Sequence, residues 1–201
     1  HYGAFNSLGR LIIKASAPGI PDFYQGSELW DLSLVDPDNR RSVDFEGRFE
    51  LLREIAENEP EIRKAASELL AKKDDGRIKM FLTYRLLTAR KENRELFSRG
   101  AYLPLAAEGP KKDNLICFAR RLEEKWAVTA VPRFISLLCG IDELPLSEKI
   151  WKDTYLLLPE GSPGEFVDAV TGAKLVNERG RIALKDAFSV FPGVMMTGCY
   201  R

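Results

Sequence analysis

A dense group of polar and aromatic side chains follows a short apolar run early in the chain. Residues 19–26 read Gly-Ile-Pro-Asp-Phe-Tyr-Gln-Gly, and Ser-Glu-Leu-Trp-Asp comes directly after them. We expect the run to form a buried strand that opens into a loop, which is where barrels and open α/β sheets bind ligands. Trp30, between Glu28 and Asp31, has the type and neighbours to stack on a sugar ring while carboxylates and amides bind its hydroxyl groups. Spacing alone supports equally well a Trp30 in the core and a Glu28 that caps a turn.

A second polar run, residues 36–41, combines turn formers with two adjacent guanidinium groups. It reads Asp-Pro-Asp-Asn-Arg-Arg. Aspartate, asparagine and proline favour tight turns and arginine pairs with carboxylates, so we expect a turn held by ion pairs. Contact with a substrate is the alternative role, and spacing does not decide between the two.

Carboxylates are frequent here, and cleavage of a glycosidic bond by double displacement needs two of them. They must lie about 5 to 5.5 Å apart, one as nucleophile and one as acid/base. The carboxylates that qualify by type are Glu28, Asp31, Asp36, Asp38 and Asp44. Carboxylates in a polar loop are usually solvated, so we assign no catalytic residue to this chain.

The remaining reactive residue types suggest no metal, cofactor or nucleophile site. Cys117, Cys139 and Cys199 are odd in number and widely spaced, which favours neither a disulfide framework nor a zinc site. His1 stands at the first position, so no Ser/His or Cys/His arrangement can be built, and there is no glycine-rich phosphate-binding motif. Because helical spacing begins almost at once after His1, we expect the chain to be part of a longer protein.

The composition is that of an ordinary globular protein. The 201 residues carry 30 Lys+Arg against 30 Asp+Glu, a formal net charge of +0, so we expect no nucleic-acid partner. Charge-free stretches fall far short of the ~20 apolar residues that span a bilayer. The first 30 residues are interrupted by charges, unlike a secretory signal. We therefore expect no membrane partner and a cytoplasmic location.

Apolar residues recur with helical spacing in the first half of the chain. We predict helices over residues 5–15, 49–56, 62–70 and 78–97. The last is apolar on nearly all sides, so we expect it to lie between the other helices and whatever follows. Residues 27–44 lack any steady period, and a loop of this length is usually functional or mobile.

From Gly100 onward, short β-rich runs are separated by glycine, proline and aspartate. They are residues 101–105, 115–119, 126–131, 154–158, 166–170, 181–184 and 190–196. This pattern is typical of an antiparallel β-sandwich, with hairpin turns expected at residues 123–125 and 170–173. The predicted class is α+β, and we place a domain boundary between residues 98 and 99.

Two adjoining stretches of the sequence, residues 19–28 and residues 29–41, resemble a known family. Residues 19–28 resemble the eighth-strand signature of the α-amylase superfamily, glycoside hydrolase family 13. The continuation through residues 29–41, Leu-Trp-Asp-Leu-Ser-Leu-Val-Asp-Pro-Asp-Asn-Arg-Arg, is more specific and resembles maltooligosyl trehalose synthases. Weaker motifs at residues 79–85, 97–105, 151–154 and 159–160 extend the likeness over most of the chain.

The resemblance implies the C-terminal portion of an isomerase. Residues 1–98 would be the helical remnant of the end of a (β/α)8 barrel, and residues 99–201 the antiparallel β-sandwich domain that follows it. The implied reaction is an intramolecular transglycosylation of maltooligosaccharides, which turns the reducing-end α-1,4 bond into an α,α-1,1 bond. The superfamily's catalytic Asp, Glu and supporting Asp follow strands four, five and seven. They would lie upstream, so this chain alone should be inactive.

The same resemblance implies roles for the polar runs. It implies sugar-site or supporting positions for Tyr24, Gln25, Glu28, Trp30 and Asp31. It implies positions that shape the pocket wall for Asp36, Asn39, Arg40 and Arg41.

Without its neighbouring strands, the eighth strand would expose unpaired backbone. Residues 18–26 should therefore leave the strand conformation or pair with another copy, which makes self-association an expected property. Two other readings stay open: a stand-alone carbohydrate-binding or interaction module, which would need an exposed Trp126 or Trp151, and part of an amylase-like α-glucan hydrolase.

Overall fold

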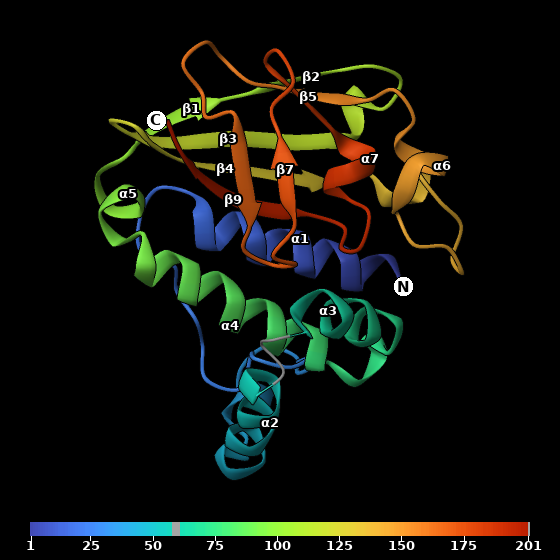
Figure 1. Cartoon of the computed structure of the whole chain (residues 1–201). Helices are drawn as coiled ribbons and strands as arrows, with labels where there is room; N and C mark the ends of the chain where they lie inside the picture. The colour runs from blue at the N-terminus through green and yellow to red at the C-terminus, as the bar shows by residue number, and fades with distance from the viewer. Residues whose placement is uncertain (58–60, 201) are drawn as a thin grey trace.

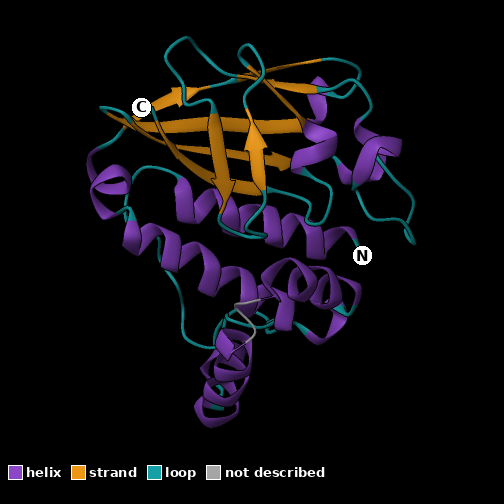
Figure 2. Ribbon diagram, viewed as in Figure 1, coloured by secondary structure: helices purple, strands orange, loops and turns teal. Residues whose placement is uncertain are grey.

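The computed structural model describes residues 1–57 and 61–200. It places most of the helices on one side of the molecule and the strands on the other (Figure 1), and Figure 2 shows the same division by secondary structure. The expected α+β class is confirmed, because the main helices come first in the chain and the strand pairings that the structure describes are antiparallel.

The four helical patterns are confirmed, the last of them as two helices. These are α1 (Tyr2–Ser16), α2 (Phe45–Glu57), α3 (Ile62–Ala71), α4 (Arg77–Glu92) and α5 (Arg94–Arg99). The break between α4 and α5 falls at Asn93, whose backbone N–H and side-chain amide both donate to the carbonyl oxygen of Ala89 at 3.0 Å. Asparagine competes in this way with the regular helical hydrogen bonds, which apolar spacing does not reveal.

The strands form two sheets. The first has the order β1-β3-β4-β9-β6-β7 and the second the order β2-β5-β8. Their bounds are β1 (Ala101–Pro104), β2 (Ala106–Glu108), β3 (Leu115–Leu122), β4 (Lys125–Pro132), β5 (Tyr155–Leu157), β6 (Glu165–Asp168), β7 (Lys174–Val176), β8 (Arg181–Ala183) and β9 (Val194–Cys199). β2 and β7 were not predicted. β2 consists of alanine and glutamate, which are depleted in strands, and β7 has only two apolar residues, Leu175 and Val176.

Short helices connect these elements. The helices α6 (Ser147–Trp151) and α7 (Leu184–Ala187) lie among the strands, and the 3-10 turns within the described residues include η1 (Asp38–Arg40), η3 (Lys73–Asp75), η4 (Lys112–Asn114) and η5 (Ile135–Leu137). Both expected hairpin turns are confirmed. Leu122 pairs with Lys125 across the β3–β4 turn, and residues 170–173 join β6 to β7.

The helices α1 and α5 pack against the large sheet. α1 packs on β4 and β9 and also on α4, and α5 packs on β3 and β4. We expected the helix predicted over residues 78–97 to lie between the other helices and the rest of the chain. Its second part, α5, does so by packing on β3 and β4, whereas α4 packs mainly against α1, α2 and α3. α4 carries Lys79, Arg85 and Arg90 among its apolar residues, and each reaches out to a backbone carbonyl oxygen of another segment.

One continuous hydrophobic core joins the helices to the sheets. Arg120 of β3 is only 2% exposed and spans the two parts. Its guanidinium donates to the carbonyl oxygen of Gly100 at 2.7 and 3.2 Å and to that of Ser16 at 3.4 Å. The end of α1 is thereby tied to the residue that precedes β1.

The strand expected over residues 19–26 is not formed. Residues 17–44 contain no strand, and Ile20 is 96% exposed. A strand needs a hydrogen-bonding neighbour, and none lies beside this segment among the residues that the structure describes. The expectation that residues 18–26 leave the strand conformation in this chain is therefore confirmed.

Candidate functional site

The segment that carries the expected site is held to the helices by cationic side chains. Arg90 of α4 donates to the carbonyl oxygens of Ala15 and Gly19, at 2.7 and 2.6 Å. Lys14 of α1 donates to the carbonyl oxygen of Asp22 at 2.7 Å. These bonds fix residues 15–22 where the hydrogen bonds of a sheet would otherwise be expected.

Trp30 is packed at the start of α4. Its Nε1 donates to the carbonyl oxygen of Lys73 at 2.6 Å, and the ammonium of Lys79 lies 5.6 Å from its ring centroid. Lys79 also donates to the carbonyl oxygen of Leu29 at 2.9 Å. Gly76 has φ +81°, and a Cβ there would lie 3.0 Å from the backbone nitrogen of Trp30. The close approach of this loop to α4 therefore depends on a glycine.

Glu28 is paired with Arg48 of α2. Nε of Arg48 lies 3.1 Å from Oε2 of Glu28, and the same guanidinium donates to the carbonyl oxygens of Gly26 at 3.2 Å and Asp44 at 3.0 Å. Arg48 thus joins the end of the expected strand to the start of α2. Glu28 is a bound ion-pair partner in this chain.

Tyr24 and Gln25 project from a turn. The carbonyl oxygen of Tyr24 accepts hydrogen bonds from the backbone N–H of Ser27 at 3.1 Å and from its hydroxyl at 2.6 Å. Both side chains are exposed, Tyr24 to 54%. They are available to a ligand or to another protein segment.

Asp31 is exposed, and its charged form is favoured. Oδ1 accepts a hydrogen bond from the backbone N–H of Ser33 at 2.9 Å. Hydrogen bonding to Ser33 lowers the pKa of Asp31, with smaller contributions from the charges of Lys79 and Arg41.

The loop of residues 36–41 is a turn tied by ion pairs, as expected. Arg40 Nη2 donates to Asp36 Oδ2 at 2.9 Å, and Arg41 pairs with Asp38. Asp38 also accepts from the backbone N–H of Leu34 at 2.7 Å. Asp36, Asn39, Arg40 and Arg41 are exposed on this loop.

Three grooves lie along the helices, and two of them are also lined by residues of the polar loop. The first, which we call the basic groove, has a volume of about 540 Å³ and is lined by α1, α4 and residues of the loop, including Arg10, Lys14, Lys79 and Asp31. The second, the apolar groove, has a volume of about 470 Å³ and lies between α2 and α4, with Glu28 in its wall. Glu28 and Asp31 thus line different grooves, and the structure does not bring these two carboxylates into one cavity.

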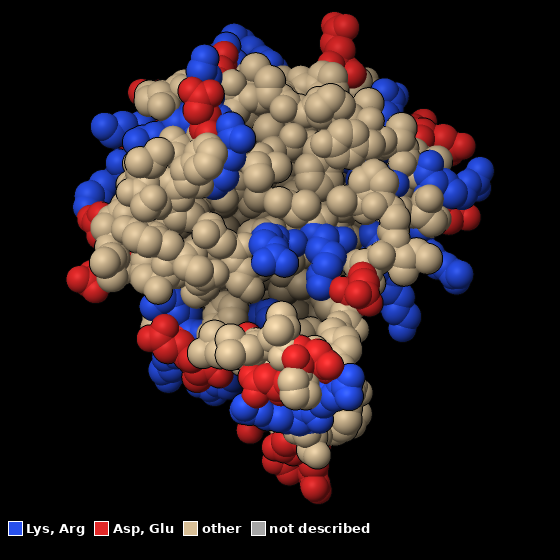
Figure 3. All heavy atoms as spheres, turned by 180° about the vertical axis from the view of Figure 1, so that it is seen from behind, with Lys and Arg blue, Asp and Glu red and all other residues tan. Residues whose placement is uncertain are grey.

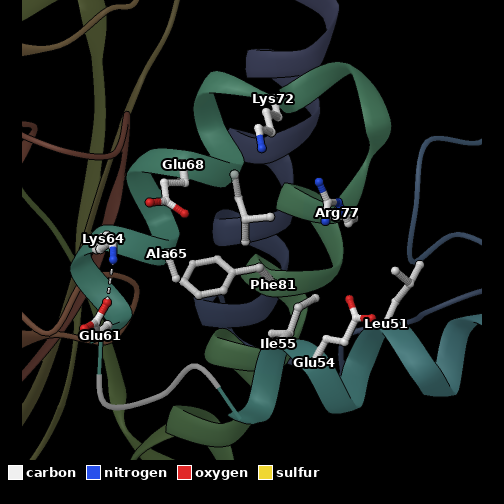
Figure 4. A pocket seen from close by; sticks show the side chains of 11 residues that line it. Leu51, Glu54, Ile55, Glu61, Lys64, Ala65, Glu68, Lys72, Arg77 and Phe81 are labelled. Atoms are coloured by element: carbon white, nitrogen blue, oxygen red, sulfur yellow. Dashed lines mark hydrogen bonds and ion pairs between the residues drawn. The ribbon is translucent and has the colours of Figure 1, made fainter.

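The third groove is a small pocket of about 190 Å³ lined by residues of α2, α3 and α4 (Figure 4). Lys64 and Glu61 form an ion pair of 2.9 Å at its edge, and Phe81 and Ile55 make part of its wall. Its lining contains none of the residues singled out from the sequence.

Sequence reasoning missed the basic groove. Arg10 and Lys14 are four residues apart and so share one side of α1. The alternation of these cations with apolar residues was visible, but the position of Lys79 opposite them depends on how α1 and α4 pack.

The tryptophans that a stand-alone sugar-binding module would need are buried. Trp126 is 1% and Trp151 0% exposed, and Nε1 of Trp151 donates to the carbonyl oxygen of Pro145 at 2.9 Å. Neither indole is available to stack on a sugar. The module reading therefore loses the feature on which it depended.

The described residues offer little reactive chemistry elsewhere. Within residues 1–57 and 61–200, no group of three or more His, Cys, Asp or Glu side chains could hold a metal ion. The three cysteines are free, and burial raises the pKa of the Cys117 thiol to about 11, which disfavours a reactive thiolate. None of the described helices combines the length and the apolar character needed to cross a bilayer.

Comparison with known proteins connects these features to one group of enzymes. No protein-family model matches the chain. A protein of Mycobacterium tuberculosis assigned as a maltooligosyl trehalose synthase is 34% identical over 191 residues, which is 95% of this chain. The chain spans about a fifth of the length of the curated relatives that it matches, since the match covers 20% of that protein.

Solved structures agree with this match. The maltooligosyltrehalose synthase from Arthrobacter ramosus superposes with a TM-score of 0.66 and 32% identity, over 96% of this chain and 22% of that one. A second maltooligosyl trehalose synthase gives a TM-score of 0.58 and 28% identity, over 97% of this chain and 22% of its own.

An α-amylase from Anoxybacillus shares the fold alone, with a TM-score of 0.58 and 18% identity over 98% of this chain. The expectation of a piece of an amylase-type fold is therefore confirmed. Over nearly its whole length, the chain is related in sequence and in structure to a portion of maltooligosyl trehalose synthases.

Proposed function

We propose that the chain is the C-terminal portion of an intramolecular transglycosylase that acts on maltooligosaccharides. The parent enzyme would cleave the reducing-end α-1,4 bond and join the released glucose again through an α,α-1,1 bond, so that the product ends in trehalose. The observation that carries this proposal is the 34% identity over 95% of the chain with a protein assigned as a maltooligosyl trehalose synthase.

In this proposal, residues 1–98 supply the end of the catalytic barrel and residues 99–201 the β-sandwich domain that follows it. The reactive acids would belong to another part of the parent. The ion pair of Glu28 with Arg48 supports this division, as does the placement of Glu28 and Asp31 in different grooves. A double displacement needs two facing carboxyl groups about 5 to 5.5 Å apart.

The test is direct. Purified chain is incubated with maltopentaose, and the products are separated by chromatography. We expect no trehalose-ended product and no released glucose. A trehalose-ended product that tracks with the pure chain would contradict the proposed inactivity.

We assign the polar loop to the wall around the reducing-end sugar. Tyr24, Gln25, Glu28, Trp30 and Asp31 would contact or support the sugar, and Asp36, Asn39, Arg40 and Arg41 would shape the rim. A wall that excludes water favours joining the cleaved glucose again over hydrolysis. The 2.6 Å bond of Trp30 to Lys73 gives this wall a fixed point on α4's N-terminal side.

In the intact parent enzyme, Trp30→Ala should lower the ratio of trehalose-ended product to free glucose. Phe134→Ala is the control, because Phe134 is an aromatic residue that is 58% exposed and lies within residues 99–201, outside the polar loop. An unchanged ratio in Trp30→Ala would argue against a role of the wall in excluding water.

We also propose that the isolated chain self-associates. Large apolar side chains are strongly exposed along residues 20–35 and on α2: Ile20 96%, Leu32 92%, Leu34 77%, Val35 85% and Phe49 69%. Exposed apolar surface of this kind favours association. Sedimentation velocity should show dimers or larger species, and a monomer across a hundredfold range of concentration would contradict the proposal.

A further inference from the structure

Three cationic side chains line the basic groove without an ion-pair partner. Arg10 and Lys14 come from α1, and Lys79 faces them from α4. Within the described part of the chain, none of the three lies within salt-bridge distance of a carboxylate. Asp31 is the carboxylate in this lining, and Ser33 already occupies one of its oxygens. The groove therefore carries an excess of positive charge.

Most hydrogen-bond donors of these cations are unused. Lys14 gives one hydrogen bond to Asp22, and Lys79 gives one to Leu29. An ammonium has three donors and a guanidinium five, so the groove retains donors on both sides. Burial and the positive charges of Lys14 and Arg10 lower the pKa of Lys79, while the negative charges of Asp31 and Glu28 oppose this, and the net direction is downward. An anion placed between the three cations would relieve their repulsion.

The groove is also larger than a simple ion requires. Its volume of about 540 Å³ is within the range of small-molecule sites. Ile13 and Phe23 give it an apolar wall, and Phe23 is held in place by the ammonium of Lys14, 4.0 Å from its ring centroid. Seen from behind, the molecule shows Lys and Arg side chains gathered on the middle of this face, above a hollow (Figure 3). Size and lining together suit an anion that is attached to a less polar body.

We propose that the basic groove binds a phosphate monoester carried on a sugar, with Arg10, Lys14 and Lys79 around the phosphate and the sugar ring against Ile13 and Phe23. A phosphate monoester carries close to two negative charges at neutral pH, which matches three cations less one carboxylate. Phosphate oxygens accept strong charge-assisted hydrogen bonds from both ammonium and guanidinium groups. This ligand differs in charge from the substrate of the proposed reaction, which is a neutral oligosaccharide, and Asp31 would line both sites.

Titration calorimetry of the whole chain at low salt tests the proposal. The probes are glucose 6-phosphate, inorganic phosphate and, as the neutral control, maltose. We expect glucose 6-phosphate to bind more tightly than phosphate, maltose to give no signal at this site, and affinity to fall with added salt. Equal affinity for phosphate and glucose 6-phosphate would overturn the role of the sugar ring. Absence of binding up to about 10 mM would overturn the site.

Variants locate the site. Arg10→Gln and Lys79→Met should each weaken binding of glucose 6-phosphate about tenfold. Arg94→Gln is the matched control, because Arg94 is an exposed helical arginine outside the groove, and its binding should be unchanged. The Arg10 side chain makes no hydrogen bond to another described residue, so Arg10→Gln should fold normally even if Lys79→Met does not. Binding that Arg10→Gln leaves intact, or that Arg94→Gln weakens equally, would overturn the assignment.

Discussion

The indole Nε1 of Trp30 donates a hydrogen bond of 2.6 Å to the backbone carbonyl oxygen of Lys73. This bond joins the loop after residue 26 to the 3-10 turn η3, which directly precedes α4. Trp30 is therefore part of the scaffold in this chain, whatever it contacts in the parent enzyme.

Trp30→Phe should lower the free energy of unfolding by about 1 kcal/mol. The substitution keeps most of the apolar contact and removes the donor, which leaves the carbonyl oxygen of Lys73 without this partner. Urea denaturation measures the difference. Tyr24→Phe, which alters an aromatic side chain that is 54% exposed, should change stability by less than about 0.5 kcal/mol. Equal stability of Trp30→Phe and the unsubstituted chain would show that this hydrogen bond contributes nothing to stability.

Gly76→Ala should destabilise the chain more than Gly161→Ala. Both glycines have positive φ, +81° and +76°, so alanine at either position costs about 1 kcal/mol of backbone strain. At Gly161 nothing lies within 4 Å of the added Cβ, whereas at Gly76 it meets the backbone of Trp30 at 3.0 Å. We expect about 2 to 3 kcal/mol in total for Gly76→Ala. Equal losses in the two variants would contradict the close approach of the loop to α4.

Arg120→Met should cost about 3 kcal/mol. Arg120 is 2% exposed and hydrogen-bonded to Gly100 and Ser16, and its removal leaves buried carbonyl oxygens without partners. The neighbour Arg121 is exposed, so Arg121→Met should cost less than about 1 kcal/mol. Chemical denaturation of the two variants side by side gives the comparison, and similar losses would refute a tie between α1 and β1 through Arg120.

Asp168 should make stability fall as the pH rises from about 4 through 6. Burial raises the pKa of Asp168 to about 6 from an ordinary value of 3.8, although its Oδ2 accepts hydrogen bonds from Thr171. Its Oδ1 has no hydrogen-bond partner in the described structure. The folded chain holds this proton more tightly than the unfolded chain does. The stabilisation is therefore complete below pH 4 and is lost as the pH passes 6.

The measurement compares urea unfolding at several pH values in the unsubstituted chain and in the Asp168→Asn variant. The variant cannot titrate at this position, so the difference between the two curves isolates Asp168 from the other carboxylates. We expect the free energy of unfolding of the unsubstituted chain, relative to that of the variant, to decline between pH 4 and 6 and to level off above pH 6. A constant difference would show that folding does not shift the pKa of Asp168.

Local patterns predicted much of the fold. Helical spacing found α1, and hairpin residues located the turn between β3 and β4, because both signals are contained within a few neighbouring residues. The helix break at Asn93 was missed, since it depends on one side chain that competes with the backbone. The strand at residues 19–26 was expected from composition that suits a sheet, but a strand also requires a neighbour, which sequence spacing does not supply.

The candidate site was predictable in part. The ion pairs of the turn at residues 36–41 are local, three and four residues apart, and were expected. The bond between Arg48 and Glu28 joins residues that are 20 positions apart, and that between Trp30 and Lys73 spans 43. Pairings of this range follow from the packing of α2 and α4, so residue types alone could not identify them.

The first helix of the chain touches its last strand. α1 packs on β9, and the preceding Gly193 leaves room for Ile12, whose Cδ1 would lie 2.6 Å from a Cβ at that glycine. The first helix and the last strand are therefore held in place by contact with each other, although they lie at opposite ends of the chain. Neither half can come loose while the other stays intact, so a calorimeter should record a single cooperative melting event in which the helical and the strand-rich parts are lost together.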